Sequence, residues 1–276
     1  DRSVSRGLGD VYKRQAILRL QSGEEFMDKY HPMKSLAPRD VVARAIYREM
    51  TRRGEDFVYL DVTHKDPDSV RSHFPNIYEK CLSIGIDITK DWIPVTPAAH
   101  YCCGGVRVDT NGQTSIKRLY ALGETSCTGL HGANRLASNS LIEAVVYADQ
   151  AARHTASLLE KADFQEGIPD WDFEGTQHTE EMLMIIQSKR EMQTIMSNYV
   201  GIVRSDLRLK RAWTRLDLLY EETEELFKRV KATKDICELR NMINVGYLIT
   251  RQAIERKESR GLHYTIDYPK HAYDQK

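Results

Sequence analysis

The sequence has no excess of charge of either sign and no long apolar run. Lysine and arginine together number 40, and so do aspartate and glutamate. This balance gives no electrostatic basis for binding nucleic acid or an anionic membrane surface. No apolar stretch approaches the roughly 20 residues that are needed to cross a bilayer. We therefore expect neither nucleic acid nor a membrane among the partners of this chain.

Cysteine and histidine are present, but without the spacing of a metal site. The 5 cysteines are an odd number, and the adjacent pair Cys102–Cys103 does not form a Cys-x-x-Cys motif. The histidines are also scattered along the chain. These patterns predict no metal site, and they favour reduced thiols and a cytoplasmic location.

Residues 1–15 lack the character of the rest of the chain. They have neither the period of an amphipathic helix nor the apolar core of a secretory signal. We interpret them as a non-native leader and begin the fold prediction at residue 16. With 276 residues and a hydrophobic content of 41%, the chain is long enough to form more than one domain core.

The first third of the sequence alternates helical and extended patterns. Residues 39–52 follow Pro38 and carry one apolar face, which predicts a helix. Residues 57–62 are aromatic and β-branched, which predicts a strand. Residues 67–84 have helical spacing, but Pro75 lies within them and is expected to kink or split the helix.

The middle of the sequence predicts a turn, a strand and a long helix. Asn111–Gly112 is typical of a hairpin turn between short strands. Residues 119–124 have the pattern of a buried strand that ends in a glycine and an acid. A helix from about 139 to 160 has apolar residues on more than one face, which predicts burial against a sheet.

The last third of the sequence is almost entirely helical. A linker rich in acidic residues and glycine covers 162–177. A first helix near 178–199 and two apolar stripes predict a small antiparallel bundle. The fold class is therefore α/β or α+β, followed by a C-terminal helical bundle. The two stripes consist of Val203, Leu207, Ala212, Leu216, Leu219 and Leu226, and of Ile236, Leu239, Ile243 and Ile254.

Three motifs occur in order between residues 97 and 143. They read PAAHYCCGG, LYALGETSCTGLHGANR and ASNSLIE, and they are accompanied by LAPRDVVARAI at 36–46 and RKESRGLHYTIDYP at 256–269. Over residues 16–270 this set resembles the succinate dehydrogenase/fumarate reductase flavoprotein family. Ala137–Ser138 stand where the respiratory members usually carry two glycines, so the resemblance is greatest to the members that oxidise L-aspartate.

The motif that opens this family is missing from the chain. The sequence contains no strand–GxGxxG–helix unit, which binds the ADP half of FAD. The resemblance therefore implies the C-terminal half of an enzyme, inactive alone. It assigns residues 16–98 to part of the substrate-capping domain, 99–161 to the C-terminal segment of the FAD-binding domain, 162–177 to the linker, and 178–276 to the helical bundle with a C-terminal tail.

The resemblance implies non-covalent FAD as the cofactor and places three residues beside it. Glu124 ends the expected strand, where its carboxylate can accept hydrogen bonds from hydroxyl groups of the cofactor. Ser140 and Leu141 begin the long helix, whose N-terminus favours negative charge, and the family pattern directs this end to the flavin ring. From the residues alone, Glu124 would be interpreted as a solvated acid at the end of a strand. The alternative for Ser140 is a plain helix cap, and one serine can have both roles.

The same resemblance implies a dicarboxylate substrate, L-aspartate or fumarate. Arg135 is the expected carboxylate ligand, because a guanidinium binds a carboxylate through two parallel hydrogen bonds. His100 is implied as a second donor, and Arg39, a cation in the first turn of a helix, as the catalytic residue. We expect these three side chains to face one cavity. The alternatives are a structural ion pair for Arg135, a structural or merely exposed histidine for His100, and an ordinary solvent-exposed arginine for Arg39.

Two further motifs are interpreted as structural. His131, within HGANR, is expected to have mainly a structural role. Arg260 and His263, within ESRGLH, are expected to dock the helical bundle on the preceding part of the chain.

Three functions are compatible with the sequence. The first, implied by the resemblance, is FAD-dependent oxidation of L-aspartate to iminoaspartate, with electrons passed to dioxygen or fumarate, as the first step of de novo NAD biosynthesis. It also implies a functional link to quinolinate synthase. The second is a succinate dehydrogenase or fumarate reductase flavoprotein subunit. The third is a non-catalytic helical interaction module.

Overall fold

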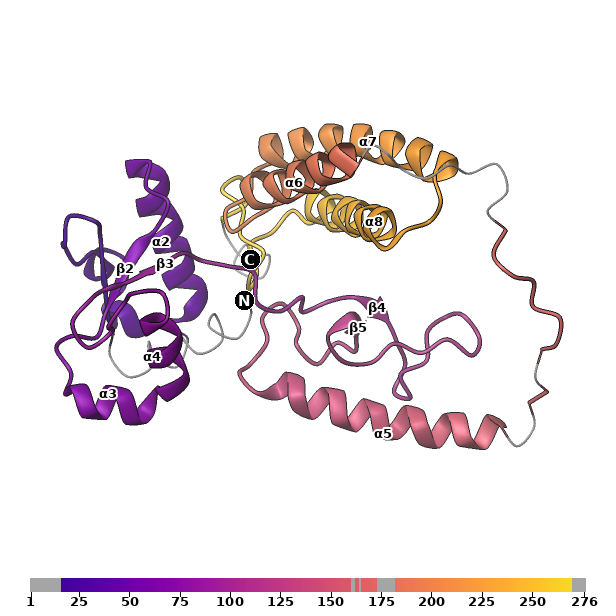
Figure 1. The fold of residues 1–276 in the computed structure, drawn as a ribbon, viewed down its shortest axis with the longest axis horizontal. Helices are drawn as coiled ribbons and strands as arrows, with labels where there is room; N and C mark the ends of the chain where they lie inside the picture. Colours follow the sequence, from indigo (N-terminus) through magenta and orange to yellow (C-terminus); the bar gives the residue numbers. More distant parts are fainter. Residues whose placement is uncertain (1–15, 160–161, 164, 173–181, 270–276) are drawn as a thin grey trace, which may run out of the picture. The chain divides into compact units, whose positions relative to one another are not determined.

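The chain divides into two compact units, Asp1–Tyr101 and Cys102–Lys276, whose elements are shown in Figure 1. The structure is a computed structural model, and it describes residues 16–159, 162–163, 165–172 and 182–269. The leader expected at 1–15 lies outside the described residues. Within the described ranges, no helix has both the length and the apolar character that spanning a bilayer requires. In the same ranges, no cluster of histidine, cysteine and acidic side chains could hold a metal ion.

An antiparallel sheet forms the centre of the first unit. The elements of this unit are the strands β1 (Ile17–Arg19), β2 (Val58–Asp61) and β3 (Ile93–Val95), the 3-10 helices η1 (Met27–Lys29) and η2 (Lys34–Leu36), and the helices α2 (Arg39–Arg53), α3 (Pro67–His73) and α4 (Pro75–Leu82). β2 is the middle strand, and its Leu60 lies opposite both Leu18 and Ile93. These three side chains are buried, so the sheet contributes directly to the core of the unit.

Proline and glycine set the bounds of the helices in this unit. α2 begins directly after Pro38 and ends at Gly54, whose φ of 68° is left-handed. Pro75 separates α3 from α4, because proline lacks an amide hydrogen and clashes with the preceding turn. The helix, the strand and the split helix that we expected in this part of the sequence are confirmed.

The second unit begins with a short parallel pairing. Its first elements are β4 (Val106–Arg107), η3 (Gly123–Thr125), β5 (Ser126–Cys127) and α5 (Asn139–Leu159). β4 pairs with β5 in parallel. A turn is present at Asn111–Gly112, where the Asp109 carboxylate accepts a hydrogen bond from the backbone N–H of Asn111 at 2.9 Å. Of the two short strands expected around this turn, β4 forms before it, but β4 pairs in parallel with β5 and not across the turn. The predicted hairpin is therefore wrong.

The buried strand expected at 119–124 does not form either. Tyr120 makes an isolated bridge to Gln113, and Leu119 is 48% exposed. A buried strand needs a hydrogen-bonded neighbour along its whole length. Among the described residues, this segment pairs with a neighbour only at the bridge between Tyr120 and Gln113, and it does not form a continuous ladder.

Helix α5 has the predicted bounds but not the predicted burial. Glu143 and Ala151 are buried, whereas Leu141, Ile142 and Val145 are 73%, 63% and 71% exposed. The prediction that this helix is buried against a sheet is therefore wrong for the part of the chain that the structure describes. An apolar pattern shows which surface can be buried, but it does not show what covers that surface.

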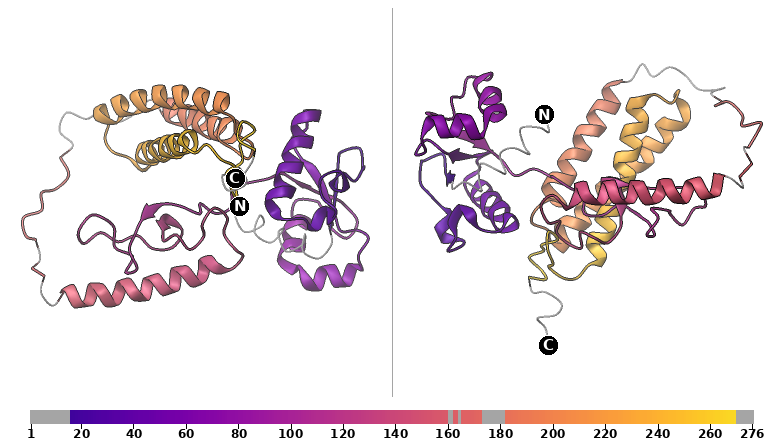
Figure 2. Two further views of the ribbon diagram at one scale, coloured as in Figure 1. Left: turned by 180° about the vertical axis from the view of Figure 1, so that it is seen from behind. Right: turned by 90° about the horizontal axis from the view of Figure 1, so that it is seen from below.

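Three long helices form a bundle in the rest of this unit. They are α6 (Met182–Tyr199), α7 (Asp206–Arg229) and α8 (Lys234–Glu255), and they lie side by side in both views of Figure 2. Ser205 caps α7, because its hydroxyl accepts the Arg208 amide at 3.2 Å. The predicted helical bundle is confirmed. One residue of the predicted apolar stripe of α7 is wrong, because Leu207 is 71% exposed, whereas Leu209 is buried.

A half-buried arginine, Arg204, anchors the segment that follows α8. The Arg204 amide donates to the Tyr264 carbonyl, and the Arg204 carbonyl accepts the Ile266 amide. The Arg204 guanidinium lies 2.7 Å from Nδ1 of His263, whose Nε2 lies 3.2 Å from the Arg256 carbonyl. Arginine can only donate, so Nδ1 accepts and Nε2 carries the proton of a neutral imidazole. Burial, and next the charge of Arg204, lower the pKa of His263 from its ordinary 6.5.

We predict that acidification destabilises the second unit through His263. Its pKa is lower in the folded chain than in the unfolded chain, so the unfolded chain gains the extra proton first as the pH falls through 6.5. The free energy of unfolding should therefore decrease in that range. His263→Gln keeps an acceptor and a donor but does not titrate. Thermal unfolding between about pH 8 and pH 5 should show a weaker pH dependence in this variant, and an equally steep loss would contradict the prediction.

Candidate functional site

Arg39 is the first residue of α2, in the first unit. Its Nη2 atom donates to the carbonyl oxygen of Ser35 at 2.9 Å and to that of Ala37 at 3.1 Å. A cation at a helix N-terminus opposes the helix dipole. The two carbonyl groups offset this disadvantage, and they turn the guanidinium back over the segment that precedes the helix.

The predicted substrate residues are divided between the two units. His100 is exposed and lies near the end of the first unit, in a segment without helix or strand. Arg39 belongs to the same unit, whereas Arg135 belongs to the second. Their convergence on one cavity therefore stays a prediction.

Arg135 lies in a loop between β5 and α5 that turns sharply on both sides of it. Gly129, Gly132 and Ser138 have φ angles of 87°, 52° and 69°, which are left-handed conformations. The arginine is half-buried, and its Nη1 atom donates to the Leu136 carbonyl at 3.2 Å. The loop thus carries a planar guanidinium, whose donor geometry suits a carboxylate.

A buried hydrogen-bond network ties this loop to α5. Thr128 Oγ1 donates to Glu143 Oε1 at 2.5 Å, and His131 Nε2 donates to Glu143 Oε2 at 2.7 Å. The side chains of His131 and Glu143 are 6% and 1% exposed. This agrees with the structural role expected for His131. Our sequence analysis missed Glu143, although an acid inside the apolar run LIEAVV was a signal of it.

The ESRGLH segment contacts the same loop. The Leu262 amide donates to the Ala133 carbonyl at 3.0 Å. Gly261 has a φ of 57°, and a Cβ atom at this position would lie 2.4 Å from the Ala133 oxygen. Glycine is therefore required at 261 for both its conformation and this close approach. The contact supports the docking role that we expected for this motif.

The residues expected near FAD have the chemistry that its flavin half requires. Ser140 and Leu141 lie in the first turn of α5, where the helix dipole favours negative charge. Leu141 is 73% exposed, so an aromatic ring could pack on it. Glu124 is exposed in η3, and its Oε1 accepts the Cys102 amide at 3.3 Å. A carboxylate can also accept hydrogen bonds from cofactor hydroxyls, so these residues fit the group.

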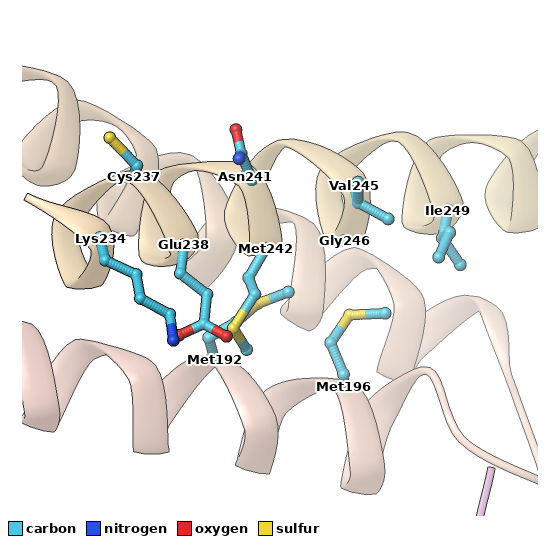
Figure 3. A pocket seen from close by; sticks show the side chains of 10 residues that line it. All are labelled: Met192, Met196, Lys234, Cys237, Glu238, Asn241, Met242, Val245, Gly246 and Ile249. Carbon is cyan, nitrogen blue, oxygen red and sulfur yellow. The ribbon is translucent and has the colours of Figure 1, made fainter. Parts of the chain in front are cut away.

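A groove of about 620 Å³ lies between α6 and α8, and none of the predicted site residues lines it. Figure 3 shows the sulfur-containing side chains of Met192, Met196 and Met242 in it. Gly246 makes room for them, since a Cβ atom there would lie 2.1 Å from Met192 Cε. This lining is mainly apolar and does not suit a dicarboxylate.

Two protein families match the sequence. Residues 3–141 match the FAD binding domain family, and residues 189–276 match the fumarate reductase flavoprotein C-terminal family. The chain belongs to the succinate dehydrogenase/fumarate reductase flavoprotein family. FAD is the cofactor of this family, and the first match includes Glu124, Arg135 and Ser140. Leu141 is the last residue of that match.

Individual relatives cover most of this chain but only part of their own length. The chain is 51% identical to L-aspartate oxidase of Pseudomonas aeruginosa over 254 residues, which are 92% of this chain and 47% of that protein. It is 46% identical to the chloroplastic L-aspartate oxidase of Oryza sativa, over 92% of this chain and 41% of that protein. A solved quinol–fumarate reductase matches with a TM-score of 0.80 and 29% identity, over 95% of this chain and 52% of that one. The chain thus spans about half the length of the relatives it matches.

We predict that Gly261→Ala loosens the contact with the Arg135 loop. The new Cβ would clash with the Ala133 oxygen, and the left-handed conformation adds strain of about 1–3 kcal/mol. Hydrogen exchange at the Leu262 amide should therefore accelerate. Gly132→Ala is a matched control, because Gly132 has a φ of 52° and a Cβ atom added there would meet nothing within 4 Å. Equal acceleration in both variants would rule out a specific role for the contact.

Proposed function

We propose that the protein containing this chain uses FAD to oxidise L-aspartate to iminoaspartate and passes the electrons to dioxygen or fumarate, as the first step of de novo NAD biosynthesis. One observation carries this proposal: the Arg135 loop leads directly into the helix N-terminus of α5, which suits a flavin. An anion-binding side chain and a cofactor-binding helix end are thereby adjacent. The 51% identity to an L-aspartate oxidase over 254 residues supports the choice of substrate.

The substrate carries two carboxylates, and each needs a partner. Arg135 would bind one of them through its guanidinium fork. Arg39 would act as a fixed cation that offsets the other charge, and His100 would donate a hydrogen bond to a carboxylate oxygen. A dicarboxylate that leaves water needs fixed donors for both of its charges. We therefore propose that Arg39, His100 and Arg135 face one cavity.

The cofactor residues of this chain would orient the flavin half of FAD. Bound FAD would supply the acceptor for the hydride that leaves the substrate Cα. Glu124 would accept hydrogen bonds from cofactor hydroxyl groups. Ser140 and Leu141 would present the first turn of α5 to the ring, where the positive end of the helix dipole stabilises negative charge.

We further propose a cytoplasmic location and a functional link to quinolinate synthase. All of the cysteines are free thiols, as expected in a reducing compartment. The link follows from the chemistry of the product, because an imine hydrolyses in water. An enzyme that consumes the imine promptly would limit this loss.

A succinate dehydrogenase or fumarate reductase subunit is the second candidate function. The TM-score of 0.80 to a quinol–fumarate reductase favours it. Ala137–Ser138 disfavour it, because the respiratory members usually carry two glycines there. The two functions differ in substrate, so rapid oxidation of L-aspartate and slow oxidation of succinate would support the first.

We predict that Arg135→Leu, made in the whole protein, lowers kcat/KM for L-aspartate by orders of magnitude. Leaving a buried charge without its partner costs on the order of 3–5 kcal/mol. Arg135→Lys should also be poor, because the planar fork is lost. Steady-state kinetics with L-aspartate measure both effects.

The matched control for these variants is Arg153→Leu. Arg153 lies in α5, the helix that follows the Arg135 loop, but its side chain is 80% exposed and pairs with Asp149, so this variant should keep normal activity. Normal turnover and substrate affinity in Arg135→Leu would remove Arg135 from the site.

A further inference from the structure

We propose that Glu143 and His131 are a positioning pair that fixes the Arg135 loop in the conformation that binds a carboxylate. The inference rests on the proposed function in one respect, namely that Arg135 binds the substrate. Glu143 and His131 do not themselves touch the substrate. They act through the backbone of the loop.

The carboxylate of Glu143 is buried in a helix that is otherwise mostly exposed. Its side chain is 1% exposed, whereas the adjacent Ile142 is 63% exposed. Both carboxylate oxygens accept hydrogen bonds, one from Thr128 at 2.5 Å and one from His131 at 2.7 Å. Burying a carboxylate costs free energy unless it is fully hydrogen-bonded, and an apolar side chain would avoid this cost. We therefore infer that position 143 carries a buried carboxylate because this group holds the Arg135 loop.

The two partners of Glu143 hold the loop on the N-terminal side of Arg135. Thr128 lies where the loop begins, directly after β5. His131 lies within the turn, and its carbonyl accepts the Asn134 amide at 3.2 Å. The two loop glycines have left-handed φ angles, and glycine leaves the backbone unusually free to move. Hydrogen bonds to a single buried carboxylate remove much of that freedom.

A guanidinium needs a defined orientation to bind a carboxylate through two parallel hydrogen bonds. Binding sites of this kind tolerate displacements of about 0.5 Å and rotations of about 10–20°. His131 and Arg135 are the first and last residues of the HGANR motif, so only a short backbone segment joins them. A displacement of His131 therefore also displaces Arg135.

Loss of the pair should raise KM for L-aspartate more than it lowers kcat. In the proposed function Arg135 binds a carboxylate that the reaction does not change. The interaction is therefore equally strong in the ground state and in the transition state, and weakening it acts on KM. Groups that orient metal-binding side chains contribute about 10–100-fold in affinity or activity, and we take an effect of the same size for a pair that orients an arginine.

The test uses Glu143→Ala and Glu143→Gln in the whole, FAD-loaded protein. We expect Glu143→Ala to raise KM about 10–100-fold, with little change in kcat, and to accelerate hydrogen exchange in residues 128–135. Glu143→Gln keeps the shape of the side chain and a hydrogen-bonding group, so its effects should be intermediate. It also serves as the test variant if Glu143→Ala does not fold.

Tyr120→Phe is the matched control. It removes a different hydrogen bond to α5, between the Tyr120 hydroxyl and His154 Nδ1 at 2.6 Å. It should change neither KM nor the exchange of residues 128–135. A KM increase of the same size in this control would show that any loosening of α5 has this effect, and it would overturn the proposal.

Two other results would also overturn the positioning role. One is unchanged exchange in residues 128–135 in both Glu143 variants. The other is loss of FAD or of thermal stability with an unchanged KM, which is the result expected of a merely structural pair. A third combination separates the two proposals. If exchange in residues 128–135 is faster in the Glu143 variants but KM is unchanged in Arg135→Leu, the pair positions the loop and Arg135 does not bind the substrate.

Discussion

The hydrogen bond from the Leu262 amide to the Ala133 carbonyl joins two segments that are remote in the sequence, and the loop that carries Arg135 depends on it. Glu143 holds the same loop from α5. The segment that supplies Leu262 is in turn anchored on the half-buried Arg204, which lies just before α7 of the helical bundle. The bundle therefore contributes to the candidate site, although none of its helices supplies a predicted ligand.

Polar groups with hydrogen-bonded partners restrict the conformation of the region around the Arg135 loop. Glu143 and His263 are buried and Arg204 is half-buried, and each of the three has hydrogen-bonded partners. A buried polar group that loses its partner destabilises the fold strongly, so each of them permits few arrangements of its neighbours. An apolar core alone would stabilise this region without defining where Arg135 lies. The polar network thus connects the packing of the second unit with the placement of the Arg135 side chain.

Local sequence patterns predicted where most helices begin and end, but they predicted less well which surfaces are buried and which segments pair. Pro75 ends one helix and begins the next, because proline cannot donate the backbone hydrogen bond that the interior of a helix requires. The expected strand at 119–124 and the burial of α5 depended on neighbours that a local pattern does not identify. The proximity of Arg135 to Ser140 was predictable, because both lie at one junction between loop and helix. The buried partners of Glu143 were not, because an acid in an apolar run does not show what it binds.

The most direct test of the central claim is a crystal structure of the whole protein with FAD and succinate bound. One succinate carboxylate should lie within hydrogen-bonding distance of the Arg135 guanidinium, with Arg39 and His100 at the same ligand and the bond between His131 and Glu143 intact. A succinate bound elsewhere, or Arg39 and Arg135 on opposite surfaces of the protein, would contradict it.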